Sequence, residues 1–428
     1  MTPGINLWLT DVYFIYLRMG TLNTEEVLIA ICSIVVLSYL FSIVSRYIRI
    51  PSVLLLLFAG IGFRVVADAY KADISFSPQL IESLGVVGLI MIVLEAGLDL
   101  KLERSKLGLI RNSFFSALVI FAISAALLTV ILVNWLHEPV EKCLVYAIPL
   151  SIMSSSIVIP SINPLSEQKK EFLVYEASFS DIIGIIVFNY FISGDTLTAR
   201  SLGVFGGEIA LSVILSVILS FFLLFILAKT RLNIKFFLIF SLLILIYAGG
   251  KIFHLPSLII ILVFGLLINN WEKLKWEKVL KYFPHEQVEA LRHLLHSVTA
   301  ETSFLIRTFF FILFGFSISL RFLSEPEILL VGSLIVIAMF LVRILYLRFF
   351  VRTNLFPESF FIPRGLITIV LFYKIPANLR LSTFNDGILF FVILTTSIIM
   401  ALGMVFYKKK PDQIVEESQF LENTQTDK

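Results

Sequence analysis

The stretch YAIPLSIMSSSIVIPSINP, residues 146–164, decides the fold, because it combines the apolar character of a membrane span with residues that disrupt helices. Three consecutive serines, Ser154 to Ser156, stand just ahead of Pro160. Proline removes a helical hydrogen bond, and backbone freed at membrane depth is tolerated only where it is buried in protein or lines a cavity. The stretch therefore predicts a broken helix beside a functional cavity.

A second stretch with the same character is FFIPRGLITIVLFYKIP, residues 360–376, in which Pro363 and Gly365 bracket Arg364. When predicted spans 1–6 and 8–13 are taken as the two halves of the chain, each of the two stretches falls in the fifth span of its half. Broken helices in corresponding places of two halves are the best sequence indication of a transporter's binding site near the bilayer midplane. A proline kink without function is the alternative for either span taken alone.

The composition places both stretches in a membrane protein. Of the 428 residues, 58% are hydrophobic and 15% are charged, and the mean hydropathy is +0.96. Apolar runs of about 20 residues, long enough to cross a bilayer as helices, recur along the chain. We predict an all-α polytopic membrane protein with about thirteen transmembrane helices, forming two inverted repeats with broken crossing helices. The predicted spans are 24–46, 51–70, 79–98, 112–136, 140–163, 170–193, 203–228, 233–251, 255–271, 300–322, 328–352, 358–379 and 385–407.

Basic residues in the loops predict the orientation, because Lys and Arg collect on the cytoplasmic side of a membrane. Their distribution favours an external N-terminus and a cytoplasmic C-terminus, and no removable signal peptide is expected. The only long connection, 272–299, mixes charged and apolar residues, which predicts amphipathic helices on the cytoplasmic membrane surface. The predicted divisions are an N-terminal segment 1–22, a transmembrane domain 23–410 with repeats at about 24–193 and 233–407, the linker 272–299, and a short cytoplasmic tail 411–428.

Few ionisable residues fall inside the predicted spans. A charge at mid-bilayer costs about 3 kcal/mol or more on insertion scales, so such residues usually face a protein interior or an ion path. Arg307 receives no assigned partner from the sequence and could equally reach toward the nearer interface, and Lys374 has no assigned role. The set is Glu95, Glu176, Asp181, Arg307, Arg343, Arg364 and Lys374.

Two of these carboxylates belong to one span, within YEASFSDIIGIIVFNY, residues 175–190. Glu176 precedes Asp181 by five positions, which on an α-helix turns the two side chains roughly 140° apart. They therefore cannot serve one site. We expect Asp181, near the midplane, to face a cavity, and Glu176 to face a neighbouring helix that carries an arginine. The alternative for Glu176 is a position that is simply close to a loop.

Four motifs in order resemble the monovalent cation:proton antiporter superfamily, specifically the sodium/proton exchanger domain. VLEAGLDLKLERSKL at 93–107 is similar to an acidic EAGL signature. EASFSD at 176–181 resembles E-S-L-x-N-D, with Asp181 on the ion-binding aspartate. FLVRILYL at 340–347 is similar to the helix whose arginine pairs with the motif's glutamate, and PRGLITIVLF at 363–372 to the arginine–glycine motif of the second broken helix.

The sequence also departs from the family pattern. Many members have T-D-P in the first broken helix, where this chain has Ser155, Ser156 and Ile157. Ala177 replaces a serine, and Ser180 stands where the family has Asn in electroneutral exchangers or Asp in electrogenic ones. These changes bear on ion selectivity more than on exchange itself.

The resemblance implies an antiporter in which Asp181 holds either a proton or a monovalent cation, Na⁺ first and Li⁺ or K⁺ as alternatives. We expect Ser155, Ser156 and Ser180 to contribute oxygen atoms, and Glu95 to help or to be simply solvated at the interface. Glu176 with Arg343 would be a structural pair, and Arg364 would offset the negative carbonyl ends of broken helices. With one titratable carboxylate, exchange should be electroneutral.

The resemblance further implies alternating access by a core domain that moves against a dimerising scaffold, hence a homodimer in membrane lipid. We expect a bacterial inner membrane. The competing hypothesis is a potassium efflux system or a gated cation channel; such systems usually carry a large regulatory domain that is not seen here. No set of enzymatic groups, cofactor motif or nucleic-acid signal is present, so we expect no enzyme, no cofactor and no nucleic-acid partner.

Overall fold

The computed structural model describes most of the transmembrane domain. The described residues are 24–48, 50–69, 78–100, 104–162, 164–192, 199–229, 236–252, 257–271, 285–317, 325–351, 356–381 and 383–407. The predicted N-terminal segment 1–22, the first part of the linker and the tail 411–428 lie outside these residues.

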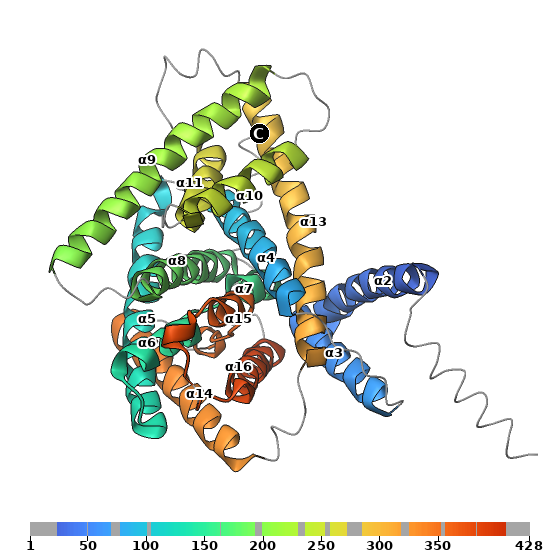
Figure 1. Cartoon of the computed structure of the whole chain (residues 1–428), viewed down its shortest axis with the longest axis vertical. Coiled ribbons are helices and arrows are strands. Elements are labelled where there is room, and N and C mark those ends of the chain that lie inside the picture. The colour runs from blue at the N-terminus through green and yellow to red at the C-terminus, as the bar shows by residue number, and fades with distance from the viewer. Residues whose placement is uncertain are drawn as a thin grey trace, which may run out of the picture.

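The described chain is helical, and every predicted span corresponds to a helix or to a helix interrupted by extended backbone (Figure 1). Within these residues, seven helical segments are long and apolar enough to cross a membrane, and shorter apolar helices accompany them. The α-helices are α2 (Thr24–Ile48), α3 (Ser52–Ala69), α4 (Pro78–Asp99), α5 (Leu107–Leu136), α6 (Val140–Ser151), α7 (Ser155–Ser161), α8 (Glu167–Ile192), α9 (Ala199–Lys229), α10 (Phe236–Ile252), α11 (Ser257–Asn269), α13 (His285–Ser317), α14 (Pro326–Tyr346), α15 (Leu366–Tyr373) and α16 (Asp386–Phe406). Short helical turns are η1 (Arg104–Lys106), η4 (Leu347–Val351), η5 (Glu358–Phe360) and η6 (Ala377–Leu379).

Both broken helices are present, and their extended segments cross. The first break, residues 152–154, separates α6 from α7, and the second, residues 361–365, precedes α15. The Ser154 N–H donates to the Pro363 carbonyl oxygen at 3.0 Å, which joins the two breaks directly. Figure 1 shows α7 and α15 near the centre of the molecule, where both contact α8. We call these two extended segments the crossing.

A glycine permits the close approach at the crossing. Gly365 has extended backbone, with φ at −152°, so its conformation does not demand glycine. A Cβ atom there would instead lie 2.5 Å from the Ser154 hydroxyl oxygen and 2.9 Å from a methyl carbon of Ile157. Real Cβ atoms do not approach other atoms so closely, so the absence of a side chain lets the second break lie against the first.

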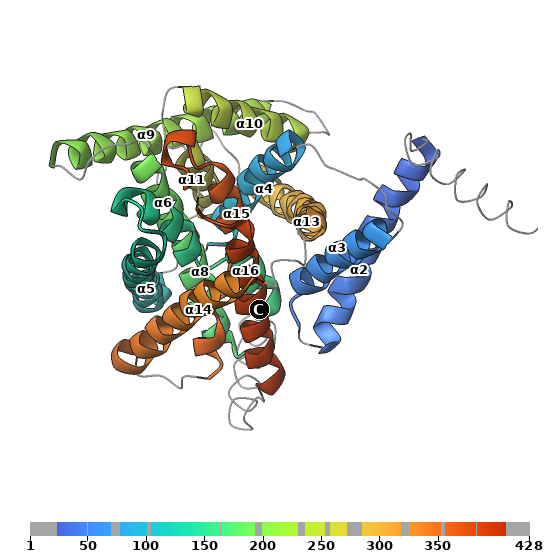
Figure 2. The ribbon, with the colours of Figure 1, turned by 60° about the horizontal axis from the view of Figure 1, so that its bottom comes forward.

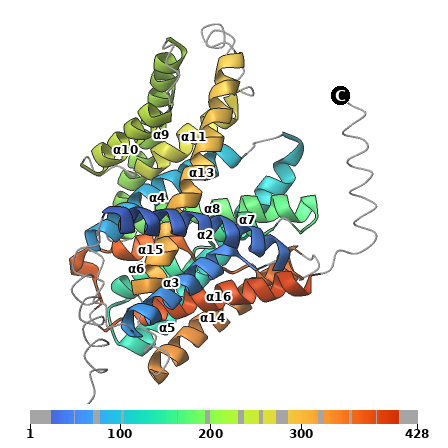
Figure 3. The same ribbon diagram turned by 90° about the vertical axis from the view of Figure 1, so that its right-hand side faces the viewer.

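The helices fall into two sets by their packing. The core set comprises α5, α6, α7, α8, α14, α15 and α16, and the scaffold set comprises α2, α3, α4, α9, α10, α11 and α13. The most extensive contacts lie within each set, for example between α13 and α3 or between α5 and α8. Figures 2 and 3 show α14 and α16 at one end of the molecule and α9 and α10 at the other. The crossing belongs to the core set.

The linker prediction requires a correction at its C-terminal end. Residues 285–299 are not a separate surface helix but the first turns of α13, which continues to Ser317 without a break. Between His285 and Phe314 the sequence holds neither proline nor glycine, so nothing stops the helix where its polar half meets its apolar half. Residues 272–284 lie outside the described part of the chain.

Candidate functional site

Asp181 lies on α8 against the first break, and its side chain is buried. Its Oδ2 atom accepts a hydrogen bond from the Ser155 N–H at 3.2 Å. Its Oδ1 atom is buried and has no hydrogen-bond partner among the described atoms. A buried oxygen that lacks a partner costs free energy, so this carboxyl group is suited to bind a proton or an ion.

A small cavity of about 20 Å³ lies beside Asp181, between α4, α8, α11 and α15. Its other lining residues are apolar, among them Ile92, Ala96, Leu262 and Ile367. A volume of this order holds about one water molecule or one small ion. The carboxyl group thus faces a space that fits a single bound species.

The predicted serines gather at the same place, but they differ in what they contact. Ser155 contacts Asp181 through its backbone N–H, as described above, and its hydroxyl group also interacts with the carboxyl group. The Ser180 hydroxyl oxygen accepts a hydrogen bond from the Met153 N–H at 2.9 Å, and so ties α8 to the first break. The hydroxyl groups of Ser154 and Ser156 lie 2.8 Å apart. The hydrogen bonds of these serines therefore mainly fix the backbone of the segment that borders Asp181.

Glu176 points away from the cavity toward α14. Its carboxylate accepts hydrogen bonds from the two terminal nitrogens of Arg343 at 2.9 and 3.2 Å, and another from the Ser116 hydroxyl at 2.6 Å. The Arg343 Nε–H donates to the Glu358 carbonyl oxygen at 2.7 Å. Both charged side chains are at most 2% exposed. The ion pair therefore joins α8 to α14 inside the core set.

Arg364, also buried, follows the proline of the second break. Its Nε–H donates to the Leu150 carbonyl oxygen at 2.5 Å, and one terminal nitrogen donates to the Ile362 carbonyl oxygen at 2.8 Å. Another terminal nitrogen reaches the Ser151 carbonyl oxygen at 3.4 Å. Leu150 and Ser151 are the last residues of α6, where helix carbonyl groups lack partners and carry partial negative charge.

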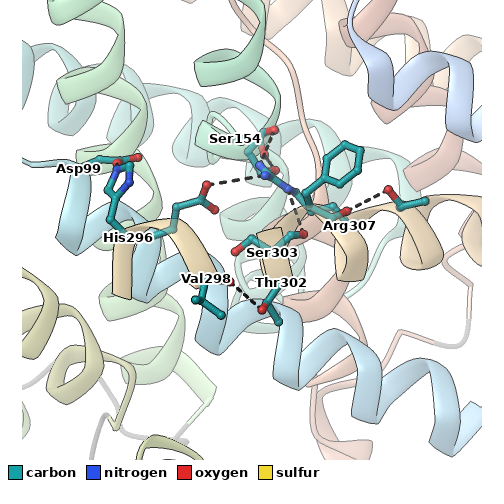
Figure 4. A network of polar contacts seen from close by, with 11 residues as sticks. Asp99, Ser154, His296, Val298, Thr302, Ser303 and Arg307 are labelled. Carbon is teal, nitrogen blue, oxygen red and sulfur yellow. Dashed lines mark hydrogen bonds and ion pairs between the residues drawn. The ribbon is translucent and has the colours of Figure 1, made fainter. Parts of the chain in front are cut away.

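Sequence patterns did not predict the contacts of Arg307, which extends from α13 of the scaffold set to α7, just after the first break (Figure 4). One of its terminal nitrogens donates to the Ser156 carbonyl oxygen at 3.3 Å, and another lies 3.7 Å from a Glu95 carboxylate oxygen. Its Nε–H donates to the Ser303 carbonyl oxygen at 3.3 Å. Its only signal in the sequence is a lone arginine in an apolar run.

Two other ionisable residues, Glu95 and Lys374, have partners other than Asp181. Glu95 is half-buried on α4 and pairs with Arg307, not with the crossing. Lys374, at the end of α15, donates to the Tyr247 hydroxyl of α10 and lies over its ring. Sequence reasoning assigned no partner to Lys374 because α10 is distant along the chain.

Comparison with known proteins decides which family has this arrangement. The model of the family described as "Sodium/hydrogen exchanger, transmembrane" matches residues 32–408. The chain belongs to the sodium/hydrogen exchanger family. It is therefore a membrane transporter and not an enzyme, as the sequence predicted.

Solved structures agree with this exchanger's fold. The sodium proton antiporter MjNhaP1 from Methanocaldococcus jannaschii, at pH 8, has a TM-score of 0.64 and 19% identity, covering 89% of this chain and 100% of its own. An electron-microscopy structure of the same antiporter gives a TM-score of 0.64 and 18% identity over 91% of this chain and 100% of its own. No curated protein sequence matches the chain. At this identity the likeness establishes the fold.

Proposed function

We propose that this exchanger transports Na⁺ in one direction and H⁺ in the other, and that Asp181 binds each in turn. The observation that carries the proposal is the unpartnered Oδ1 atom of Asp181 beside a cavity of about 20 Å³. Among the described residues no ion pair involves this carboxyl group, in contrast to Glu176, whose charge Arg343 balances.

Competition for one carboxyl group is sufficient to couple the two fluxes. A buried carboxylate without a countercharge is unfavourable, so the empty, ionised site should be rare. The proton-bound and the cation-bound forms are both neutral, and one excludes the other. If the helices move only in these neutral forms, each inward Na⁺ or H⁺ requires the other ion to leave.

The donors near Asp181 fit a hard monovalent ion. Carboxylate, hydroxyl and carbonyl oxygens are the ligands that alkali and other hard cations prefer. Ser155 and Ser156 are the first residues of α7, the helix that contacts the carboxyl group, and their hydroxyl groups can rotate toward a bound ion. The Ser180 hydroxyl group holds this segment in place by accepting a hydrogen bond from the Met153 N–H.

We further propose that one proton is exchanged for each cation. Residue 180 is a serine and contributes no charge, and Glu176 is neutralised by Arg343. One carboxyl group then changes its occupancy in each half-cycle, and the transport is electroneutral. Alternating access would come from movement of the core set against the scaffold set, within a homodimer in a bacterial inner membrane, with the C-terminus in the cytoplasm.

The first experiment measures dequenching of a pH-sensitive dye in everted vesicles after Na⁺, Li⁺ or K⁺ is added. Wild-type protein should give a cation-dependent proton flux, and Asp181→Asn should give none. Asp68→Asn is the matched control, because Asp68 lies on α3 in an exposed pair with Arg64. Equal traces for wild type and Asp181→Asn would refute the site. No response in either would favour the channel hypothesis.

A further inference from the structure

Arg307 is a half-buried cation to which exchange at Asp181 assigns no role. It lies well inside α13, in the segment Arg292–Ser317 that is long and apolar enough to cross a membrane, and its side chain is 14% exposed. A charge at such depth is costly and usually marks a functional position. Its contact with the Ser156 carbonyl oxygen passes from the scaffold set to the core set.

The sequence of α7 explains why the Ser156 carbonyl group is available. In a continuous helix this oxygen would accept from the N–H four residues later. That residue is Pro160, which has no N–H. Arg307 supplies the missing donor at 3.3 Å. The interaction thus uses an oxygen that would otherwise have no helical partner.

This oxygen lies two peptide groups along the chain from the N–H group that contacts Asp181. The Ser155 N–H donates to Asp181, and the carbonyl group of the following residue, Ser156, accepts from Arg307. A full positive charge therefore stands next to the segment proposed to bind a cation. Figure 4 shows Arg307 directed toward the segment that holds Ser154, while Asp99 and His296 lie further along α4 and α13.

We propose that Arg307 sets the exchanger's affinity for its cation: its guanidinium group occupies the Ser156 carbonyl oxygen and repels the transported ion, and Glu95 partly offsets that charge. This inference rests on the proposed exchange at Asp181. Arg307 is a positioning residue that acts on the ion through its charge and through Ser156. Its separation of 3.7 Å from Glu95 leaves the charge incompletely balanced.

A purely structural role makes a different prediction. If Arg307 only holds α13 against α7, its loss should lower the amount of folded protein and the maximal rate, with the half-saturating cation concentration unchanged. If Arg307 acts by its charge, a neutral side chain should lower the half-saturating concentration, and lysine should preserve it.

The test measures proton flux in everted vesicles against Na⁺ concentration, at one pH and with protein amounts matched. For Arg307→Gln we expect the half-saturating Na⁺ concentration to fall roughly tenfold, the order of one charge–charge interaction at a partly buried site. Arg307→Lys should stay within about twofold of wild type, because it keeps the charge. The control Arg64→Gln removes an arginine of α3 that pairs with Asp68, and should change nothing.

Glu95→Gln provides a second arm that does not depend on the stability of the first variant. Loss of its negative charge should leave Arg307 more repulsive and raise the half-saturating concentration. In Glu95→Gln/Arg307→Gln the value should return to that of Arg307→Gln, since Glu95 acts through Arg307. A double variant with weaker binding than Arg307→Gln would instead make Glu95 a direct ligand and overturn the assignment.

The two proposals fail in different ways. A wild-type protein without cation-dependent flux refutes the exchange itself. If wild-type protein shows a flux but Arg307→Gln has the same half-saturating Na⁺ concentration as wild type, only the role of Arg307 is refuted. The same holds if Arg307→Gln and Arg307→Lys change the half-saturating Na⁺ concentration equally.

Discussion

Glu176 and Asp181 lie five residues apart on α8, and the structure gives them opposite surroundings. Glu176 is held by Arg343 at 2.9 Å, whereas Asp181 faces a small cavity with one carboxyl oxygen unpartnered. A helix turns by about 100° per residue, so this spacing directs one side chain toward α14 and the other toward the scaffold set. One carboxylate is paired inside the core set, and the other keeps an unpartnered oxygen beside the cavity.

Glu176→Gln should destabilise the protein strongly, because it leaves the Arg343 guanidinium buried without its countercharge. Removing one partner of a buried pair costs about 3–5 kcal/mol. The measurement is thermal unfolding in detergent. The matched control is Glu171→Gln, which breaks a pair with Lys106 whose side chains are each 34% exposed, and should cost less than about 1 kcal/mol. Similar losses in both variants would contradict a special role for the buried pair.

Much of this arrangement could be predicted from the sequence, because membrane spans and broken helices depend on local properties. Apolar runs of fixed length gave the spans, and proline and glycine gave the two breaks. The first break lies slightly earlier than the serines suggested: residues 152–154 are extended, and Ser155 and Ser156 already belong to α7. Pro149, inside α6, disrupts the helix on the near side of the break.

The remaining features depend on contacts between distant parts of the chain. Nothing near Arg307 in the sequence indicates that it reaches the Ser156 carbonyl group, or that Glu95 lies beside it. The continuity of α13 through the predicted linker was also hidden, because charged residues in its first turns mimic a surface helix. The partner of Glu176 was predictable only through the resemblance to a family.

Gly365→Ala should disrupt the crossing of the two breaks. Its new Cβ atom would lie 2.5 Å from the Ser154 hydroxyl oxygen, so the two segments must move apart. We expect a loss of transport of at least about tenfold and a stability loss of about 1–3 kcal/mol, typical of overpacking. Gly207→Ala, on α9, is the control, because no atom lies within 4 Å of the position of its Cβ. Normal flux in Gly365→Ala would show that the crossing tolerates displacement.

Arg364→Met should abolish transport, because the carbonyl groups of Leu150 and Ile362 lose their donor inside the protein. Each unsatisfied buried group costs about 1–3 kcal/mol. Arg364→Lys should recover only part of the activity, since a compact ammonium group cannot reproduce the planar set of donors. The comparison is Arg380→Met: Arg380 also donates to a backbone carbonyl oxygen, that of Ile375, but is exposed. Full activity of Arg364→Lys would indicate that charge alone is required.

The pH dependence of cation affinity tests both the competition at Asp181 and the stoichiometry. A proton on the carboxyl group excludes the cation, so lowering the pH should raise the half-saturating Na⁺ concentration and leave the rate at saturating Na⁺ much less affected. On the acid side of the carboxyl group's ionisation, the increase should approach about tenfold per pH unit if one proton competes with one cation. The measurement is flux against Na⁺ concentration at several pH values, with and without an imposed membrane potential. A slope near two, or a rate that follows the potential, would mean that a second titrating group takes part in exchange, and Glu95 would be the first residue to examine.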